Sequence, residues 1–141
     1  MTDVETLEEC RIAVIEERAL SRQIDRLALM CGPRGIGSQA LEPAGDRKTN
    51  DARAAKLQQL EGLIDRLIAL QNENLDIVQQ AESVIARIKD RKDRVVIRCY
   101  YVEGQSDYVI AEEIEMSQQW VNNRRNQIIE RLTMPKKKFR K

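Results

Sequence analysis

A long run of evenly spaced apolar residues in the middle of the chain constrains its fold more than any other feature. Between Leu57 and Ile88, mostly apolar positions recur at alternating spacings of three and four residues. The positions are Leu57, Leu60, Ile64, Leu67, Gln71, Asn74, Val78, Ala81, Ile85 and Ile88. This repeat predicts one long helix with a heptad seam that faces a partner helix.

A second long helix is predicted at the start of the chain. Thr2 and Glu5 have the spacing of a capping box, and apolar residues at helical spacing follow them, so we expect a helix over 3–31. Gly32-Pro33 ends it, and the Gly- and Pro-rich stretch 32–51 is predicted to be a flexible connector. The two helices, at ~42 Å and up to ~58 Å, are close enough in length to fold back as an antiparallel hairpin.

The apolar side of the predicted long helix is wider than one heptad seam requires. Its additional apolar residues are Leu63, Leu70, Ile77 and Val84. A broad stripe predicts more than one packing partner, and a second hairpin docking on it would form a homodimer. Within the seam, Gln71 and Asn74 either fix the register or oligomeric state or face water, and the sequence leaves both interpretations open. Thr49, Asn50 or Asp51 is expected to cap the start of this helix.

Composition favours an all-α chain. One Trp, one Phe and three Tyr cannot furnish a large core, and 33% of the residues are charged. The apolar residues are mostly Leu, Ile, Val and Ala, which suits exposed amphipathic helices. The three Cys are far apart and there is no His, so neither a disulfide framework nor a zinc site is expected. No apolar run approaches the roughly 18 residues of a membrane span, and we expect a cytoplasmic protein without cofactors.

Charge is distributed unevenly along the chain. Residues 91–141 hold 12 Lys and Arg against 7 Asp and Glu, whereas residues 1–90 hold 12 against 16. A polyanion is therefore expected to bind near the C-terminal end.

The pattern beyond Asp90 predicts three short helices over 91–134 in place of one long one. The first supplies apolar residues from Val95 to Val102 and ends at Gly104. Ser106 then caps a helix of two turns, and a turn follows at Glu115-Met116. Ser117 is expected to cap the last helix, 117–133, whose inward residues are Val121, Ile128 and Leu132. Two short helices joined by a tight turn are typical of a helix-turn-helix module.

The outer side of the last helix carries amides. Gln119, Asn122, Asn123 and Asn126 lie opposite the inward residues, with Gln118 near the leading end. Carboxamides can pair bidentately with adenine in the major groove, which accepts one α-helix.

The module resembles region 4 of bacterial sigma factors and the related phage late-gene transcription regulators of the ArpU and RinA kind. The resemblance rests on residues 98–104, 110–113 and 117–121, with Arg124, Arg125 and Leu132 after them. It implies that residues after the capping Ser enter the major groove. Small phage proteins that combine a helical hairpin, a loop like Pro33-Arg34-Gly35 and this module are similar to the whole chain.

The resemblance and the basic tail 135–141 together give a set of expected DNA contacts. The set is Gln118, Gln119, Trp120, Asn122, Asn123, Arg125, Asn126, Lys136, Lys137, Lys138 and Arg140. Trp120 could instead pack at the edge of the module, and the tail could serve only solubility or partner binding. Along DNA, the tail would add salt-sensitive affinity that is independent of sequence.

Two residues depart from the pattern of such modules. Glu115 occupies a turn position that often holds Gly, so a tolerant or strained turn is expected there. Arg124 stands where an aliphatic residue is common, and we expect it to bury its stem and reach Glu112 or Glu113.

The sequence thus predicts a non-enzymatic regulator that binds double-stranded DNA, with RNA polymerase as a possible further partner. No residue cluster in it has the pattern of a catalytic site. Two other functions stay open. One is a DNA-packaging protein of the small-terminase type, and the other is a coiled-coil scaffold without a role in nucleic-acid binding.

Overall fold

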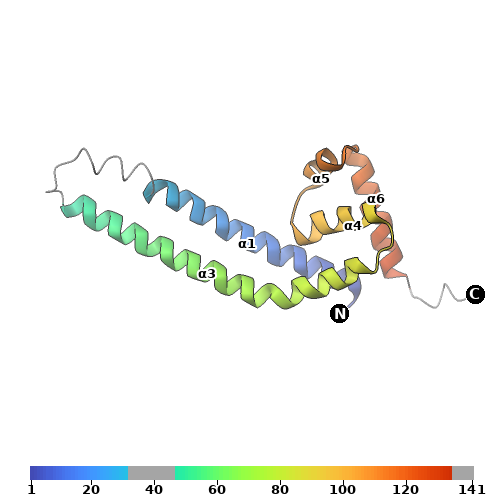
Figure 1. The fold of residues 1–141 in the computed structure, drawn as a ribbon, viewed down its shortest axis with the longest axis horizontal. Helices are drawn as coiled ribbons and strands as arrows, with labels where there is room; N and C mark the ends of the chain where they lie inside the picture. Colours follow the sequence, from blue (N-terminus) through green and yellow to red (C-terminus); the bar gives the residue numbers. More distant parts are fainter. Residues whose placement is uncertain (32–46, 135–141) are drawn as a thin grey trace, which may run out of the picture. The chain divides into compact units, whose positions relative to one another are not determined.

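The computed structural model describes residues 1–31 and 47–134, and their regular structure is helical throughout (Figure 1). In chain order the elements are α1 (Asp3–Cys31), α3 (Arg47–Ala86), α4 (Arg91–Ile97), the π-helical turn η1 (Arg98–Val102), α5 (Asp107–Ile114) and α6 (Gln118–Thr133). The predicted all-α class is confirmed. Among the described residues, no helix is both long and apolar enough to cross a membrane.

The two long helices begin differently from one another. At the start of α1 the predicted capping box is present: Thr2 N donates to Glu5 Oε1 at 2.8 Å, and Glu5 N donates to Thr2 Oγ1 at 3.1 Å. The predicted start of α3 is wrong, because the helix already begins at Arg47 and residues 49–51 lie inside it. The residues at positions 47 and 48 are Arg and Lys, which are good helix formers, so both can belong to the first turn of α3. The rest of the predicted connector, residues 32–46, lies outside the described part of the chain.

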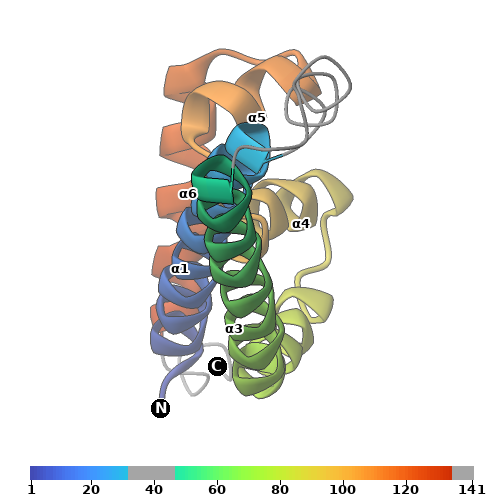
Figure 2. The same ribbon diagram turned by 90° about the vertical axis from the view of Figure 1, so that its left-hand side faces the viewer.

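The described part of the chain divides into two compact units. The first, which we call the module unit, contains the described residues 1–15 and 74–134. The second, the hairpin unit, contains the described residues 16–31 and 47–73. Helices α1 and α3 each contribute to both units, and within the hairpin unit they run side by side in opposite directions (Figures 1 and 2).

In the hairpin unit, the row of apolar residues that α3 buries differs from the predicted seam. Leu60, Leu63, Leu67 and Leu70 are partly buried there. Leu57 and Ile64, which the prediction placed in the seam, remain 43% and 39% exposed. Both stripes share Leu60 and Leu67, so the heptad spacing alone could not distinguish them.

The module unit has a core in two clusters. One combines residues of α1, α3, α4, η1 and α6, and its most buried members are Leu7, Cys10, Ala81, Ile85 and Ile97. The other cluster is Val96, Ile110, Ala111 and Val121. Because α4 and α6 contribute to both clusters, the three C-terminal helices and the two long-helix ends share one continuous interior.

Hydrogen bonds between side chains and the backbone fix the path of the chain from α3 into this core. Asp90 caps α4, and its side chain accepts from Lys92 N at 2.8 Å and Asp93 N at 3.3 Å. The Arg94 guanidinium donates to the carbonyl oxygens of Ile88 and Lys89 at 2.8 and 2.9 Å, which satisfies acceptors just beyond the end of α3. At the other end, η1 leads to Gly104, whose φ of 69° suits a residue without a Cβ.

Candidate nucleic-acid interface

Helices α5 and α6 begin with the side-chain caps that the sequence predicted. Ser106 Oγ accepts from Val109 N at 3.4 Å, and Ser117 Oγ accepts from Trp120 N at 3.0 Å. Each bond satisfies an amide that has no partner inside its own helix.

Glu115 forms the turn between the two helices in the left-handed conformation. Its φ is 58° and its ψ is 45°, which is a costly region for a residue with a Cβ. Met116 N donates to Ala111 O at 3.0 Å across the turn. The tight reversal is therefore formed without glycine.

The inner side of α6 is apolar and tightly covered. Val121 is completely buried and Ile128 is 2% exposed, and Leu132 packs against the same core. Ala111 on α5 is 5% exposed and joins Val121 in the second cluster. Burial of this side sets the rotation of α6 about its own axis, and so determines which residues face outward.

The outer side of α6 presents amides, as predicted. Gln118, Gln119, Asn122, Asn123 and Asn126 are all exposed. Asn122 Nδ2 donates to Asp107 Oδ2 at 3.1 Å, and Asn126 Nδ2 donates to Asn122 Oδ1 at 3.4 Å. Asp107 therefore orients Asn122, and Asn122 in turn orients Asn126.

The structure places Arg125 in an intramolecular ion pair and not among the exposed amides. Its Nη2 and Nε donate to the two carboxylate oxygens of Asp107 at 2.8 and 3.2 Å, and the two side chains are 12% and 14% exposed. The guanidinium also lies over the Tyr100 ring, 3.9 Å from its centroid. These contacts join α6 to α5 and to η1, and they correct the expectation that Arg125 is available to DNA.

The ion pair also affects the pKa of Asp107. Burial alone would raise the pKa of its carboxyl group. The hydrogen bonds from Arg125 and Asn122 and the positive charge of Arg125 outweigh that effect, so the pKa lies below its ordinary value.

Arg124 is also held within the module, but by a different partner from the predicted one. Its Nε donates to Asp93 Oδ1 at 2.6 Å and its Nη2 to Asp93 Oδ2 at 3.1 Å. Asp93 lies on α4 and its side chain is 2% exposed, so neither Glu112 nor Glu113 is the acceptor that was expected. A buried carboxylate requires a charged partner, and Arg124 supplies it.

Trp120 lies at the edge of the second core cluster. It is partly buried and packs against that cluster, and Lys92 Nζ lies 5.8 Å from the ring centroid. This position agrees with one of its two predicted roles, packing at the edge of the module. Contact with DNA stays a prediction for the exposed part of the ring.

The cationic residues of the module offer less to DNA than the sequence suggested. Residues 91–134 hold 7 Lys and Arg and 7 Asp and Glu, so the positive excess of the C-terminal segment comes from the tail. The tail residues Lys136, Lys137, Lys138 and Arg140 lie outside the described residues.

Arg91 and Lys92 at the start of α4 are exposed cations that the sequence reasoning missed. Their position directly after the capping Asp90 was the signal that could have found them, because residues at the start of a helix tend to be exposed. Tyr108 on α5 is 58% exposed and was likewise not predicted.

Comparisons with family models, with curated proteins and with solved structures gave no match to this chain. In the described ranges, no group of His, Cys, Asp and Glu has the arrangement of a metal site.

Proposed function

We propose that this protein is a sequence-specific regulator of transcription that binds double-stranded DNA by placing α6 in the major groove. One observation carries the proposal. α6 buries Val121 and Ile128 while it exposes an uninterrupted amide surface from Gln118 to Asn126. An exposed helix face without a binding role would be expected to favour Glu, Lys and Ala.

The proposed contacts follow from the chemistry of the amides. A Gln or Asn carboxamide can donate to N7 of adenine and accept from its N6 amino group, and a helix of about 10–12 Å diameter fits the major groove. Gln118, Gln119 and Asn123 are assigned to base edges. Asn122 and Asn126 belong to the network that starts at Asp107, so we assign them a more fixed orientation.

Phosphate contacts are assigned to cations outside the amide surface. Arg124 and Arg125 neutralise Asp93 and Asp107, which leaves Arg91, Lys92 and the tail as the proposed sources of backbone affinity. Because counterion release dominates protein–DNA affinity, a neutral module would bind weakly without the tail.

The proposal includes no catalytic step and no cofactor. The similarity to sigma region 4 favours RNA polymerase as a further partner of the regulator, and this function would place the protein in the cytoplasm of a bacterial cell.

Selection of bound duplexes from a random pool, followed by fluorescence anisotropy, tests the proposal. Asn123→Ala is expected to weaken binding to the selected site by roughly 5- to 100-fold, which corresponds to the loss of one bidentate pair. Binding to mixed-sequence duplex should change little. The matched control is Gln80→Ala, which removes an exposed amide from α3 and should leave both affinities unchanged.

Failure to enrich any sequence, together with no binding to mixed duplex at low salt, would overturn the proposal and favour the scaffold function. An assembly of eight or more subunits that binds DNA would favour packaging over regulation.

Removal of residues 135–141 tests the origin of backbone affinity. The shortened chain should bind all duplexes more weakly, and the slope of log affinity against log salt should flatten by about 0.9 for each phosphate that the tail no longer neutralises. A variant that lost only its preference for the selected site would contradict the assignment of the tail to phosphates.

A further inference from the structure

A row of exposed apolar residues remains on α3 within the hairpin unit. Leu57, Ile64 and Ile68 are 43%, 39% and 51% exposed. Together with Glu61 and Gln71 they form what we call the outer stripe, whose members are spaced by four, three, four and three residues. This alternation is the spacing that places residues along one side of a helix for contact with another helix.

The outer stripe is separate from the stripe that packs on α1. At 100° per residue, its centre lies about 100° around α3 from the line through Leu60, Leu63, Leu67 and Leu70. A further helix can therefore pack on the outer stripe without displacing α1.

The order of residues in the outer stripe is symmetrical about position 66. Ile64 and Ile68 are two residues on either side of it, and Glu61 and Gln71 are five residues on either side. In the sequence the same spacing continues to Leu75, which stands as far from position 66 as Leu57 does. We infer that the outer stripe is the contact through which α3 of one copy packs antiparallel on α3 of a second copy.

Twofold symmetry gives each residue of the stripe a compatible neighbour. In an isologous contact, Ile64 of one copy meets Ile68 of the other, and the reverse pair repeats it. Glu61 meets Gln71, whose amide can donate to the carboxylate. Leu57 meets Leu75. Apolar residues thus oppose apolar residues and polar residues oppose polar ones along the whole contact.

A parallel arrangement would also place apolar residues opposite apolar residues, but it would lose the Glu61–Gln71 pair. It would place Glu61 beside Glu61 of the other copy, and like charges at a helix contact are destabilising. Asp65 borders the stripe near its midpoint, so the antiparallel dimer also brings two carboxylates toward each other. Added salt screens that repulsion and should strengthen the dimer.

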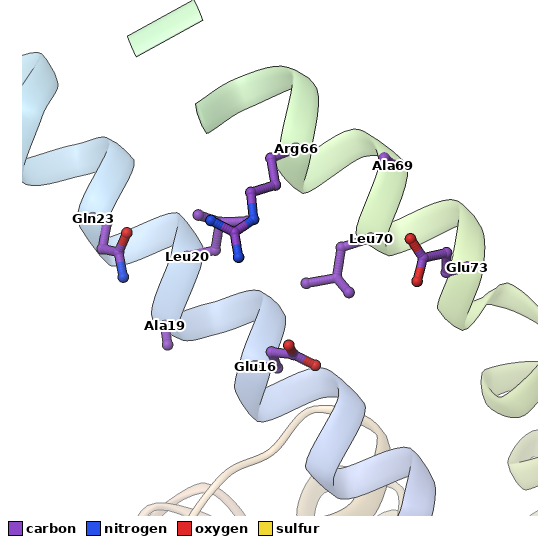
Figure 3. A pocket seen from close by; sticks show the side chains of 8 residues that line it. All are labelled: Glu16, Ala19, Leu20, Gln23, Arg66, Ala69, Leu70 and Glu73. Atoms are coloured by element: carbon purple, nitrogen blue, oxygen red, sulfur yellow. The ribbon is translucent and has the colours of Figure 1, made fainter. Parts of the chain in front are cut away.

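The opposite side of the hairpin unit is a poorer surface for a second copy. There, a cleft of about 370 Å³ lies between α1 and α3, with Ala19, Leu20, Ala69 and Leu70 in its lining. Glu16, Arg66 and Glu73 also line it, and Figure 3 shows Arg66 extending from α3 toward α1. A helix docking over these charges would have to desolvate them.

Sedimentation velocity of the full chain, from low to high micromolar concentration, tests the inference without DNA. The wild-type chain should sediment as a dimer. Ile68→Glu should weaken association on the order of 100-fold or more, because the symmetrical contact buries the new charge twice. Ala69→Glu introduces the same charge one residue farther along, outside the stripe, and should leave the dimer intact.

Circular dichroism of both variants should retain the wild-type helix signal, which excludes unfolding as the cause of dissociation. A wild-type monomer at high micromolar concentration would overturn the inference. Dissociation by Ala69→Glu but not by Ile68→Glu would also overturn it, because the cleft side would then be the contact.

Cysteine crosslinking tests the direction of packing. In chains with Cys99 replaced by Ser, a mixture of the Ile64→Cys and Ile68→Cys variants should form a mixed disulfide faster than either variant alone. Crosslinking of Ile64→Cys with itself in preference to the mixture would indicate parallel helices. Dimerisation and DNA binding are measured in separate experiments. A chain that dimerised but did not bind DNA would contradict the proposed function and support this inference.

Discussion

The module unit and the hairpin unit bury their apolar residues to very different extents. Leu7, Ile97, Ile110 and Val121 in the module unit are completely buried. In the hairpin unit, where burial is described for residues 16–31 and 51–73, the buried residues are Leu20 at 6% and Cys31 at 8% exposure. Two rods side by side can cover only one side of each other, whereas several short helices that meet at angles can enclose a side chain from all directions.

Ion pairs add to the cohesion of the module unit. In the module unit, ion pairs join helices that are far apart in sequence: Arg124 with Asp93, Arg125 with Asp107, and Arg98 with Glu82. A unit fixed by its own core and ion pairs can present α6 rigidly, whereas a unit that leaves an apolar stripe uncovered is suited to bind another chain. The two units should therefore respond differently to substitution.

The largest expected effect is a core truncation in the module unit. Ile110→Ala should lower the free energy of unfolding by roughly 3 kcal/mol, because it removes buried atoms and leaves a cavity. Ile64→Ala in the hairpin unit should change monomer stability by only about 0.5 kcal/mol. Urea titrations at low protein concentration measure both, with Trp120 fluorescence for the first variant and helix circular dichroism for the second. Equal losses would contradict the division.

A smaller effect of opposite sign is expected at the turn of the module. Glu115→Gly should raise the free energy of unfolding by about 1 kcal/mol, because glycine adopts a positive φ without a steric penalty. Glu112→Gly, at an exposed position in the last turn of α5, should lower it by about 1 kcal/mol. Urea titration with Trp120 fluorescence measures both changes. Destabilisation by Glu115→Gly would mean that the turn is not strained.

In the hairpin unit, a substitution that changes helix propensity should change the stability of the helix by a similar amount. A Cβ added to Gly62 would meet no atom within 4 Å, so Gly62→Ala should raise stability by about 0.8 kcal/mol. The reverse change at the exposed Ala69, Ala69→Gly, should lower it by a similar amount. Thermal unfolding followed by helix circular dichroism measures both, and Trp120 fluorescence should report little change.

The smallest expected effect concerns acid stability of the module unit. The pKa of Asp107 is lower in the folded chain than its ordinary value near 4, so folding is favoured while the carboxylate stays charged. This contribution is present above about pH 4 and is lost as the pH falls through the folded pKa. Urea titrations between pH 7 and pH 2.5 should show a shallower acid decline for Asp107→Asn than for the wild type. Parallel declines would show that the ion pair does not stabilise the fold.

Much of the local structure was predictable because its signals are short-range. The capping box at Thr2, the caps at Ser106 and Ser117 and the apolar side of α6 each depend on residues within a few positions of one another. The same local spacing predicted the exposed amides. The partners of Arg124 and Arg125 were not predictable in this way, because Asp93 and Asp107 are 31 and 18 positions away.

The sequence by itself therefore determined where helices form and which side of α6 carries amides, since both depend on backbone periodicity and caps. Tertiary structure alone decided which leucine stripe of α3 faces α1, that Asp93 and Asp107 neutralise the arginines of α6, and that the ends of the long helices join the module core. The physical reason is that burial and desolvation depend on groups brought together from distant positions. Periodicity limits those choices but does not select among them.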